Sequence, residues 1–372
     1  MSREYDAIIV GARVAGSITA RLLGEYGHKV LLLDRAHFPS DTLSTHFFRA
    51  TALKAFQQAG AFEQVQRAAP HLVETFHDVE GHIWSEAVEG EEGLDYLLCV
   101  RRITLDAMLT DQVQKAANVK FRQGARFTDL VRENDTVIGA RWRDRTGEYE
   151  ATARVIVGAD GFYSRVAELV EPRVEQFEPV RRAMYYTYFQ GLPPRERPAA
   201  EFYFRGNHLV YVFPTDENRT LIAISVPISE FEHFRKDAKS EMMSMLDTLP
   251  GLASRLKTAE IVAPLKGAGN IPCYQRVPYG EGWVLVGDSG QVFDPWSGQG
   301  IDHASQHAVL LADALHEFFE DKKDWARAMS EYHSRRNSSS KKNFESTRKF
   351  ARDLRPMSHG ALKKRGLELP SH

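Results

Sequence analysis

The glycine-bounded segment Gly11-Ala-Arg-Val-Ala-Gly16 constrains the fold more than any other feature of the sequence. It follows an apolar run over 5–10, which is typical of a strand, and precedes a periodic segment over 17–26, which is typical of a helix. A strand, a tight turn and a helix in this order match the dinucleotide fingerprint, in which the helix N-terminus receives a pyrophosphate. A second predicted strand over 29–34 ends in Asp34, about twenty residues on, where an acid usually binds a ribose hydroxyl. The sequence therefore predicts a Rossmann-like N-terminal region.

Within this segment each glycine has a separate task. Gly11 permits the turn, and Gly16 lets the helix pack closely on the strand. Arg13 stands where the fingerprint has its second glycine, so its Cβ should widen the approach of the backbone to phosphate. Its guanidinium is itself a good phosphate partner, and two interpretations stay open: a cation on the cofactor side, or a solvated loop residue. The predicted nucleotide contacts of this region are Gly11, Ala12, Arg13, Ala15, Gly16, Asp34 and Arg35.

Two later motifs also follow predicted strands. The run over 151–160 ends in Asp160-Gly161, which would place a carboxylate at the C-terminal edge of the sheet, where ligands bind. An ordinary Asp-Gly turn is the alternative. The run Trp283-Val-Leu-Val-Gly287 brings Asp288 to the same edge, and the turn Asp294-Pro-Trp-Ser-Gly-Gln-Gly300 leads into a predicted helix over 301–318.

Taken in order, these motifs resemble those of the FAD-dependent monooxygenase superfamily built on the para-hydroxybenzoate hydroxylase fold. Geranylgeranyl reductases and flavin-dependent halogenases are relatives within it. The resemblance covers most of residues 1–320. Besides the Gly11 loop, its carriers are Arg101-Arg-Ile-Thr-Leu-Asp106, Val155–Ser164, Gly282–Gly290 and Asp294–Gly300, and the Ser40–His46 stretch is similar to one subgroup.

The resemblance implies an FAD site and assigns roles within it. Asp288 would accept hydrogen bonds from the ribityl chain, and Arg102 would lie near the ribityl or phosphate groups, with Arg101 as the alternative. Asp160 and its loop would position FAD and engage NADH or NADPH as a transient reductant. The start of the helix after residue 300 would face the pyrimidine edge of the flavin and stabilise its negative charge when reduced. The cofactor contacts added here are Arg102, Asp160, Gly161, Gly287, Asp288, Pro295, Gly298, Gly300 and Ile301.

The implied activity is that of an oxidoreductase. NAD(P)H would reduce the flavin, O2 would add to it, and the flavin C4a-hydroperoxide would hydroxylate or epoxidise a small hydrophobic or aromatic substrate. The first alternative is a flavin-dependent reductase or dehydrogenase, since Tyr211-Val-Phe-Pro214 partly matches the Tyr-x-Trp-x-Phe-Pro pattern of geranylgeranyl reductases. A halogenase is disfavoured because the sequence has no Trp-x-Trp-x-Ile-Pro motif. The second alternative is a non-catalytic flavin sensor. No acid–base dyad stands out, so no catalytic residue is assigned.

The predicted fold class is α/β, or α+β overall, with three parts. A discontinuous FAD-binding domain takes 1–75, 100–172 and 275–320, an inserted antiparallel substrate sheet takes 76–99 and 173–274, and a helical, basic segment takes 321–372. Runs rich in aromatic and β-branched residues predict the inserted strands. The candidate substrate contacts are His46, Tyr186, Tyr211, Phe213 and Trp296. The alternative for the aromatic residues is a place in the core of the sheet. The alternative for His46 is a surface or capping position.

Composition narrows the partners and the location. The formal net charge is −2, which gives no reason to expect nucleic acid. No apolar run approaches the roughly 20 residues of a membrane span, and the first strand begins too early for a signal peptide, so we expect a cytoplasmic protein acting on a small organic molecule. Cys99 and Cys273 lack the partners of a metal or redox site, and no metal is predicted. The basic C-terminal segment could face a membrane or an acidic partner, with a solvated helix face as the alternative. Oligomeric state and substrate identity are not encoded in these patterns.

Overall fold

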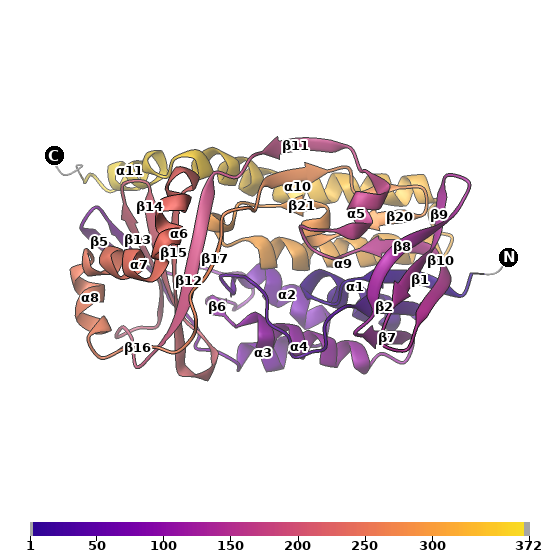
Figure 1. Ribbon diagram of the computed structural model, residues 1–372, viewed down its shortest axis with the longest axis horizontal. Helices are drawn as coiled ribbons and strands as arrows, with labels where there is room; N and C mark the ends of the chain where they lie inside the picture. Colours follow the sequence, from indigo (N-terminus) through magenta and orange to yellow (C-terminus); the bar gives the residue numbers. More distant parts are fainter. Residues whose placement is uncertain (1–2, 368–372) are drawn as a thin grey trace.

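Two large sheets form the two halves of the molecule in the computed structural model, which describes residues 3–367 (Figure 1). The first is mainly parallel, as the dinucleotide fingerprint predicts. Its parallel strands lie in the order β20 (Trp283–Leu285), β10 (Glu148–Gly158), β1 (Tyr5–Val10), β2 (Val30–Asp34) and β7 (Val119–Gln123). The short strand β19 (Tyr279–Gly280) pairs antiparallel with β20 at one edge. The predicted Rossmann-like arrangement is confirmed.

Both faces of this parallel sheet are covered, which explains why its strands are continuous apolar runs. Ala7 and Ile9 of β1 pack towards the helices, whereas Ile8 and Val10 pack towards the opposite layer. The helical layer consists of α1 (Val14–Glu25), α2 (Ala50–Gln58), α3 (Phe62–Gln66), α4 (Arg102–Gln114) and α9 (Gly300–Phe319). The opposite layer consists of β8 (Arg126–Glu133), β9 (Thr136–Arg143) and α5 (Arg165–Val170).

The second sheet is the predicted antiparallel one. Its strands lie in the order β16 (Glu260–Ile261), β12 (Arg182–Gln190), β15 (Arg219–Pro227), β14 (His208–Pro214), β13 (Ala199–Arg205), β4 (Glu74–Val79) and β5 (His82–Ala87), and β17 (Lys266–Ala268) also pairs with β12. Only the β13–β4 pairing is parallel. The aromatic and β-branched runs of the sequence therefore form strands as expected.

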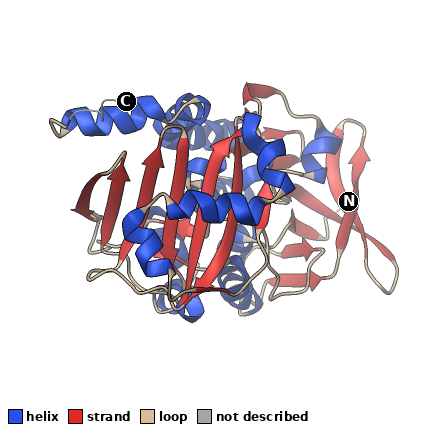
Figure 2. Cartoon of the chain, turned by 60° about the vertical axis from the view of Figure 1, so that its left-hand side comes forward, coloured by secondary structure: helices blue, strands red, loops and turns tan. Residues whose placement is uncertain are grey.

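The two faces of the second sheet have different neighbours. Helices α6 (Phe231–Lys236), α7 (Ala238–Asp247) and α8 (Pro250–Leu256) pack on one face, and Figure 2 shows helices lying across it. Because side chains alternate along a strand, Tyr185 and Phe189 of β12 point towards these helices while Tyr186 and Tyr188 point the other way. That second face turns towards the nucleotide-binding half.

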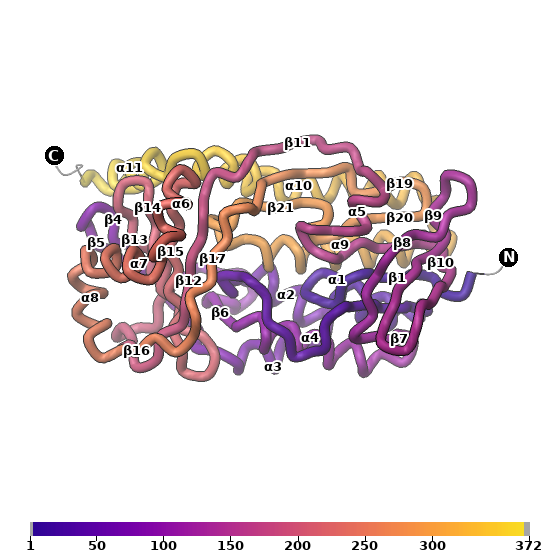
Figure 3. The backbone as a smooth tube through the Cα atoms, in the orientation of Figure 1, coloured from indigo at the N-terminus to yellow at the C-terminus, as the bar shows by residue number. Residues whose placement is uncertain are grey.

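Short strand pairings lie between the large sheets, and the chain passes between the two halves several times (Figure 3). Strand β3 (Phe47–Phe48) pairs with β6 (Leu98–Cys99). Strands β11 (Val174–Glu178), β18 (Cys273–Arg276) and β21 (Gln291–Val292) form a separate three-stranded sheet. Neither half is thus a continuous stretch of sequence, and we retain the three-part division of the chain as a prediction.

The C-terminal segment is helical, with α10 (Trp325–Arg352) and α11 (Arg355–Lys364); its residues 368–372 lie outside the described part of the chain. The solvated helix face is wrong for Arg336, which is buried and donates to the backbone carbonyl of Arg276. Arg352 is 59% exposed and pairs with Glu178 of β11. One acid that pairs with this helix therefore comes from a distant strand, whereas Glu331 pairs with Arg327 within the helix. Within residues 3–367, no helix has the length and apolar character needed to cross a membrane.

Candidate cofactor and substrate site

The glycine loop is packed directly against the end of β10. A Cβ on Gly16 would lie 1.8 Å from the carbonyl oxygen of Gly11, and a Cβ on Gly11 would lie 2.4 Å from that of Ala159. Gly11 also has a φ of 102°, which side chains rarely tolerate. No side chain in the described chain caps the N-terminus of α1, so its first amide donors stay open. An open helix N-terminus at the C-terminal edge of a parallel sheet fits a pyrophosphate.

Arg13 is not a solvated loop residue. Its Nη1 atom lies 2.5 Å from Oδ2 of the fully buried Asp106, and its guanidinium also donates to the backbone carbonyls of Ser40 and Asp41. These bonds fix the segment that leads to His46 against the start of α1. The phosphate contact of Arg13 stays a prediction.

Asp34 occupies the predicted place at the end of β2, where it organises the loop. One carboxylate oxygen accepts from the amide of Ala12 at 2.7 Å and the other from the amide of Ala36 at 2.7 Å. Arg35 beside it is exposed. The ribose contact of Asp34 and the nucleotide contact of Arg35 remain predictions.

Asp288 and Arg102 form the part of the site that best fits a ribityl chain. Asp288 lies in the single turn η3 (Gly287–Ser289), and a Cβ on Gly287 would meet that of Ala15 at 2.9 Å, so this turn packs on the start of α1. Within residues 3–367 the carboxylate of Asp288 has no hydrogen-bond partner. Burial raises its pKa to about 6, against the lowering effect of Arg102. A half-buried acceptor without a donor from the protein suits the hydroxyls of a polyol chain.

The two adjacent arginines have separate roles. Arg101 is buried, and its guanidinium pairs with Asp216 at 2.8 Å and Glu217 at 2.6 Å. Arg102 uses its Nε atom on Asp106 at 3.0 Å, and its charge acts on Asp288. This geometry favours Arg102 over Arg101 as the cofactor-side cation.

Asp160 uses its carboxylate within the protein. It accepts from the hydroxyl of Ser164 at 2.5 Å and from the amides of Arg165 and Val166, and it thereby caps α5. Burial raises its pKa. These bonds favour the turn alternative for this side chain, whereas a Cβ on Gly161 would meet only open space. The FAD and NAD(P)H roles of this loop remain predictions.

The loop after β21 brings a second open helix N-terminus to the same edge. The turn η4 (Pro295–Ser297) is followed by Gly298, whose φ of 60° is left-handed, and α9 begins at Gly300 without a side-chain cap in the described chain. A Cβ on Gly300 would meet open space, while Ile301 packs into the core. Two helices therefore present open amides to one region, as the predicted dinucleotide requires.

His46 is a buried residue with φ 61°, so its interpretation as a surface residue is wrong, whereas its ring does contact the start of a helix, α4. Its Nδ1 atom accepts from the amide of Arg102 at 3.2 Å, and its Nε2 atom lies 2.5 Å from the hydroxyl of Tyr188. Burial lowers the pKa of His46 to about 3, which keeps the ring neutral. We assign the ring proton to Nε2 from these contacts, so that His46 donates to Tyr188.

Three of the four aromatic candidates for substrate contact are packed against other protein groups. The hydroxyl of Tyr211 donates to the carbonyl of Trp296 at 2.5 Å, and the indole of Trp296 donates to the backbone of Thr347. Phe213 stacks on Phe47 with ring centres 4.7 Å apart. These contacts favour the core alternative for all three candidates, and their substrate roles remain predictions.

Tyr186 differs, because its buried hydroxyl has no hydrogen-bond partner within the described residues. Its neighbour Tyr188, bonded to His46, was missed by the sequence analysis although it lies two positions along on the same strand face. The two-residue period of the strand was the signal that could have identified it. Together Tyr186, Tyr188 and His46 form a polar cluster within an apolar layer, which we call the tyrosine–histidine cluster.

Asp294 was also missed, although it opens a motif that the sequence analysis quoted. It is 2% exposed and accepts from the amide of Trp296 at 3.1 Å. Burial raises its pKa to about 7, against lowering effects of that hydrogen bond and of Arg182. The folded protein therefore holds a proton on Asp294 at pH values where the unfolded chain does not.

Asp294→Asn should show this through the pH dependence of stability. The pKa of Asp294 is higher in the folded protein than its unfolded value near 3.9. The contribution of this proton to the free energy of unfolding is therefore fully present below pH 4 and is lost as the pH rises to about 7. Asparagine keeps the acceptor without the charge. Between pH 4 and about pH 7, the free energy of unfolding of the variant should therefore rise relative to that of the wild type by about 1.4 kcal/mol per pH unit. Urea unfolding of both proteins at pH 5 and pH 8 measures the difference, and an equal difference at both pH values would contradict the assignment.

Comparison with known proteins places most of the chain in one family. A family model described as "FAD binding domain" matches residues 4–347. The chain belongs to this family. It is a flavoprotein oxidoreductase, and the predicted FAD cofactor is confirmed at the level of the family.

Curated relatives include proteins with different reactions. Digeranylgeranylglycerophospholipid reductase 2 of Methanococcoides burtonii is 26% identical over 84% of this chain and 75% of its own. Kynurenine 3-monooxygenase of Christiangramia forsetii is 24% identical over 90% of this chain and 77% of its own. These two relatives are thus similar to most of this chain and are named for different reactions.

Solved structures support the same fold. The myxobacterial chondrochloren halogenase CndH superposes with a TM-score of 0.84 at 21% identity, covering 92% of this chain and 81% of its own. The probable FAD-dependent monooxygenase pqsL of Pseudomonas aeruginosa gives a TM-score of 0.80 at 21% identity, covering 93% and 95%. At these identities the likeness establishes the fold alone.

Proposed function

We propose that this protein is an NAD(P)H-dependent monooxygenase that hydroxylates or epoxidises a small hydrophobic or aromatic organic substrate. The observation that carries the proposal is the position of the tyrosine–histidine cluster. His46 comes from the nucleotide-binding half and Tyr186 and Tyr188 come from the second sheet, so the cluster lies where the two halves meet. An apolar layer with a few convergent polar groups is the usual lining of a site for an organic molecule.

The residues available for FAD agree with this location. The open N-termini of α1 and α9 would receive the pyrophosphate and the flavin ring, and Asp34, Arg102 and Asp288 would bind the groups between and beside them. Bound FAD, reduced by NADH or NADPH, supplies the electrons with which one atom of O2 enters the substrate and the other leaves as water. The protein would bind and orient the reactants.

The protein's own part is to exclude water and to orient the substrate. The rings of Phe47, Phe202 and Phe213 pack together beside the cluster, and such packing keeps water out. Since His46 donates to the oxygen of Tyr188, the hydroxyl proton of Tyr188 is left to donate elsewhere. Burial raises the pKa of Tyr186 to about 12, so its hydroxyl also stays protonated. Both tyrosines can thus donate a hydrogen bond to a polar atom of the substrate.

A flavin-dependent reductase is the second candidate. Its support is that several of the matched relatives are digeranylgeranylglycerophospholipid reductases, and that Tyr211-Val-Phe-Pro214 of β14 partly matches a reductase pattern. The non-catalytic flavin sensor is not proposed, because the family match makes the chain a flavoprotein oxidoreductase.

Isotope labelling separates these functions. The FAD-loaded protein is incubated with NADH or NADPH under 18O2, with a panel of phenols, anilines, aromatic acids and polyprenyl alkenes. We expect one 18O atom in the product and coenzyme oxidation that requires both substrate and O2. A product that gains two hydrogens without O2 would replace the monooxygenase by the reductase. Coenzyme oxidation that no compound of the panel stimulates would contradict the proposed substrate class.

A further inference from the structure

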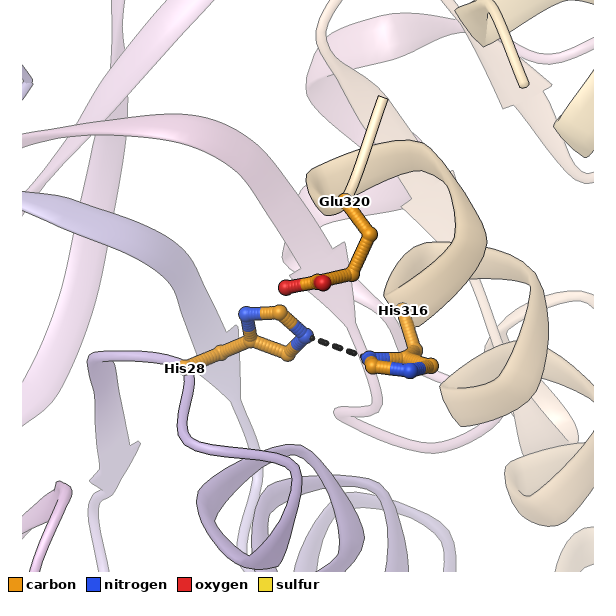
Figure 4. A group of neighbouring side chains, drawn as sticks. All are labelled: His28, His316 and Glu320. Atoms are coloured by element: carbon orange, nitrogen blue, oxygen red, sulfur yellow. Dashed lines mark hydrogen bonds between the residues drawn. The ribbon is translucent and has the colours of Figure 1, made fainter. Parts of the chain in front are cut away.

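A cluster of metal-binding side chains lies at the end of the nucleotide-binding half that is remote from the cofactor edge. It consists of His28, His316 and Glu320, and one ligating atom from each lies within 4.8 Å of the others. Figure 4 shows the two imidazoles facing each other, with the Glu320 carboxylate above the ring of His28. The sequence analysis predicted no metal, and it could not join these residues because the histidines are 288 positions apart.

The chain places His28 by a glycine-terminated helix end. Gly27, with φ 90°, follows the last turn of α1, and its amide donates to the carbonyl of Gly24. The amide of His28 then donates to the carbonyl of Leu23 at 3.0 Å. This pair of bonds is the Schellman motif, which reverses the chain directly after the helix. His28 is thereby fixed by backbone geometry and is only 6% exposed.

The other two residues come from one face of α9. His316 and Glu320 are four positions apart, so they lie one turn from each other on the same side of the helix. Two ligands at this spacing with a third from elsewhere are a common way to build a transition-metal site. Aromatic rings restrict the imidazoles, since Tyr26 lies 4.6 Å from His316 and Phe319 lies 4.9 Å from His28, between ring centres.

The spacing of the nitrogens suits a metal. Nε2 of His28 lies 2.9 Å from Nδ1 of His316. Two ligands bound at about 2.0–2.1 Å lie about 2.9 Å apart at a right angle and about 3.3 Å apart at the tetrahedral angle. The observed distance is also that of a hydrogen bond between the two rings, which an ion would replace by one bond to each nitrogen. The Glu320 carboxylate is exposed and has no ion-pair partner within residues 3–367, so it is free to complete the set.

The electrostatic surroundings also favour a cation. Helices α1 and α9 pack side by side and in parallel, because Gly287 contacts Ala15 and Ala304 near their starts while Tyr26 bonds to Asp313 near their ends. Both C-termini, with their partial negative charge, therefore meet at this cluster.

Neighbouring charges do not reverse this preference. Arg154, whose charge acts on His28, is shared between Asp6 and Asp321, each at 3.8 Å.

We infer that His28 Nε2, His316 Nδ1 and the Glu320 carboxylate bind one divalent transition-metal ion, and that Zn²⁺ is the ion that fits this set. Two imidazoles and one carboxylate are an established zinc ligand set, and the fourth position would hold water on the exposed side of Glu320. The ion would join the C-terminal ends of the two helices whose N-termini receive FAD. The inference is independent of the reaction proposed above.

Isothermal titration of the tag-free, EDTA-treated, FAD-loaded protein with Zn²⁺ tests the site directly. We expect one ion per chain, no such binding by His316→Ala, and at least tenfold weaker binding by Glu320→Gln. Glu320 is exposed, so this second variant should fold normally. Zn²⁺ should raise the melting temperature of the wild type and leave that of His316→Ala unchanged.

A matched control is Asp321→Asn, which removes a carboxylate one residue away whose side chain is 93% exposed. It should bind Zn²⁺ as the wild type does. The inference is overturned if the wild type binds no Zn²⁺, or if both His316→Ala and Glu320→Gln bind it as tightly as the wild type. Equal weakening by Glu320→Gln and Asp321→Asn would also overturn it, because a diffuse negative surface would then explain the binding.

Discussion

Replacing Asp288 by alanine should weaken FAD binding tenfold or more without loss of the fold. A hydrogen bond to a charged acceptor contributes about 1.5–3 kcal/mol, and 1.4 kcal/mol is a factor of ten in affinity. The apo-protein should not lose stability, because the carboxylate has no partner within residues 3–367 and burial raises its pKa to about 6. Loss of affinity without loss of stability is the signature that separates a cofactor contact from a structural one. Fluorescence titration of the apo-protein with FAD and thermal unfolding provide the two measurements.

The matched control for this experiment is Asp247→Ala. Asp247 is an exposed residue at the end of α7, on the face of the second sheet that is remote from the nucleotide-binding half. Its removal should change neither FAD affinity nor stability. If Asp288→Ala binds FAD as tightly as this control, the ribityl role of Asp288 is wrong.

What the sequence could predict follows from how local each feature is. The strand, turn and helix around Gly11 lie within a short segment, and the steric limits on Gly11 and Gly16 act between near neighbours and the end of β10. The aromatic runs predicted the second sheet for the same reason, since β propensity and two-residue alternation are properties of a single strand. The fold class was accessible in this way, and so was the packing of the glycine loop on which the predicted FAD site depends.

Contacts between distant segments were not accessible. His46 bonds to Tyr188 across 142 positions, and this contact depends on how the two halves meet. For Asp160 the motif is local but does not determine the role of the side chain, because an Asp-Gly pair is compatible with either a ligand-binding turn or a helix cap. Its three hydrogen bonds to the start of α5 became visible only in the folded chain.

The buried pair of Arg101 and Asp216 is the clearest product of such distant contacts. Asp216 lies in the short turn η1 (Asp216–Asn218), which connects strands β14 and β15 of the second sheet, 115 positions from Arg101. Its carboxylate accepts from the amide, Nε and Nη2 of Arg101 and from the hydroxyls of Thr104 and Thr215. Burial acts to raise the pKa of Asp216, but these hydrogen bonds outweigh it and the net pKa is lowered. One carboxylate thus joins the second sheet to the start of α4, next to Arg102.

Asp216→Ala should therefore destabilise the protein by about 3–5 kcal/mol, since it leaves the Arg101 guanidinium buried without its main partner. Urea unfolding at pH 7 measures this change. The control is Glu217→Ala, which removes the other, 60% exposed partner of Arg101 and should cost less than about 1 kcal/mol. Because the pKa of Asp216 is lowered on folding, the stability it adds is present above the unfolded pKa near 3.9 and is lost as the pH falls below it. The gap between wild type and Asp216→Ala should accordingly narrow in acid, and a gap that is small at pH 7 or constant down to pH 3 would show that this pair does not hold the two halves together.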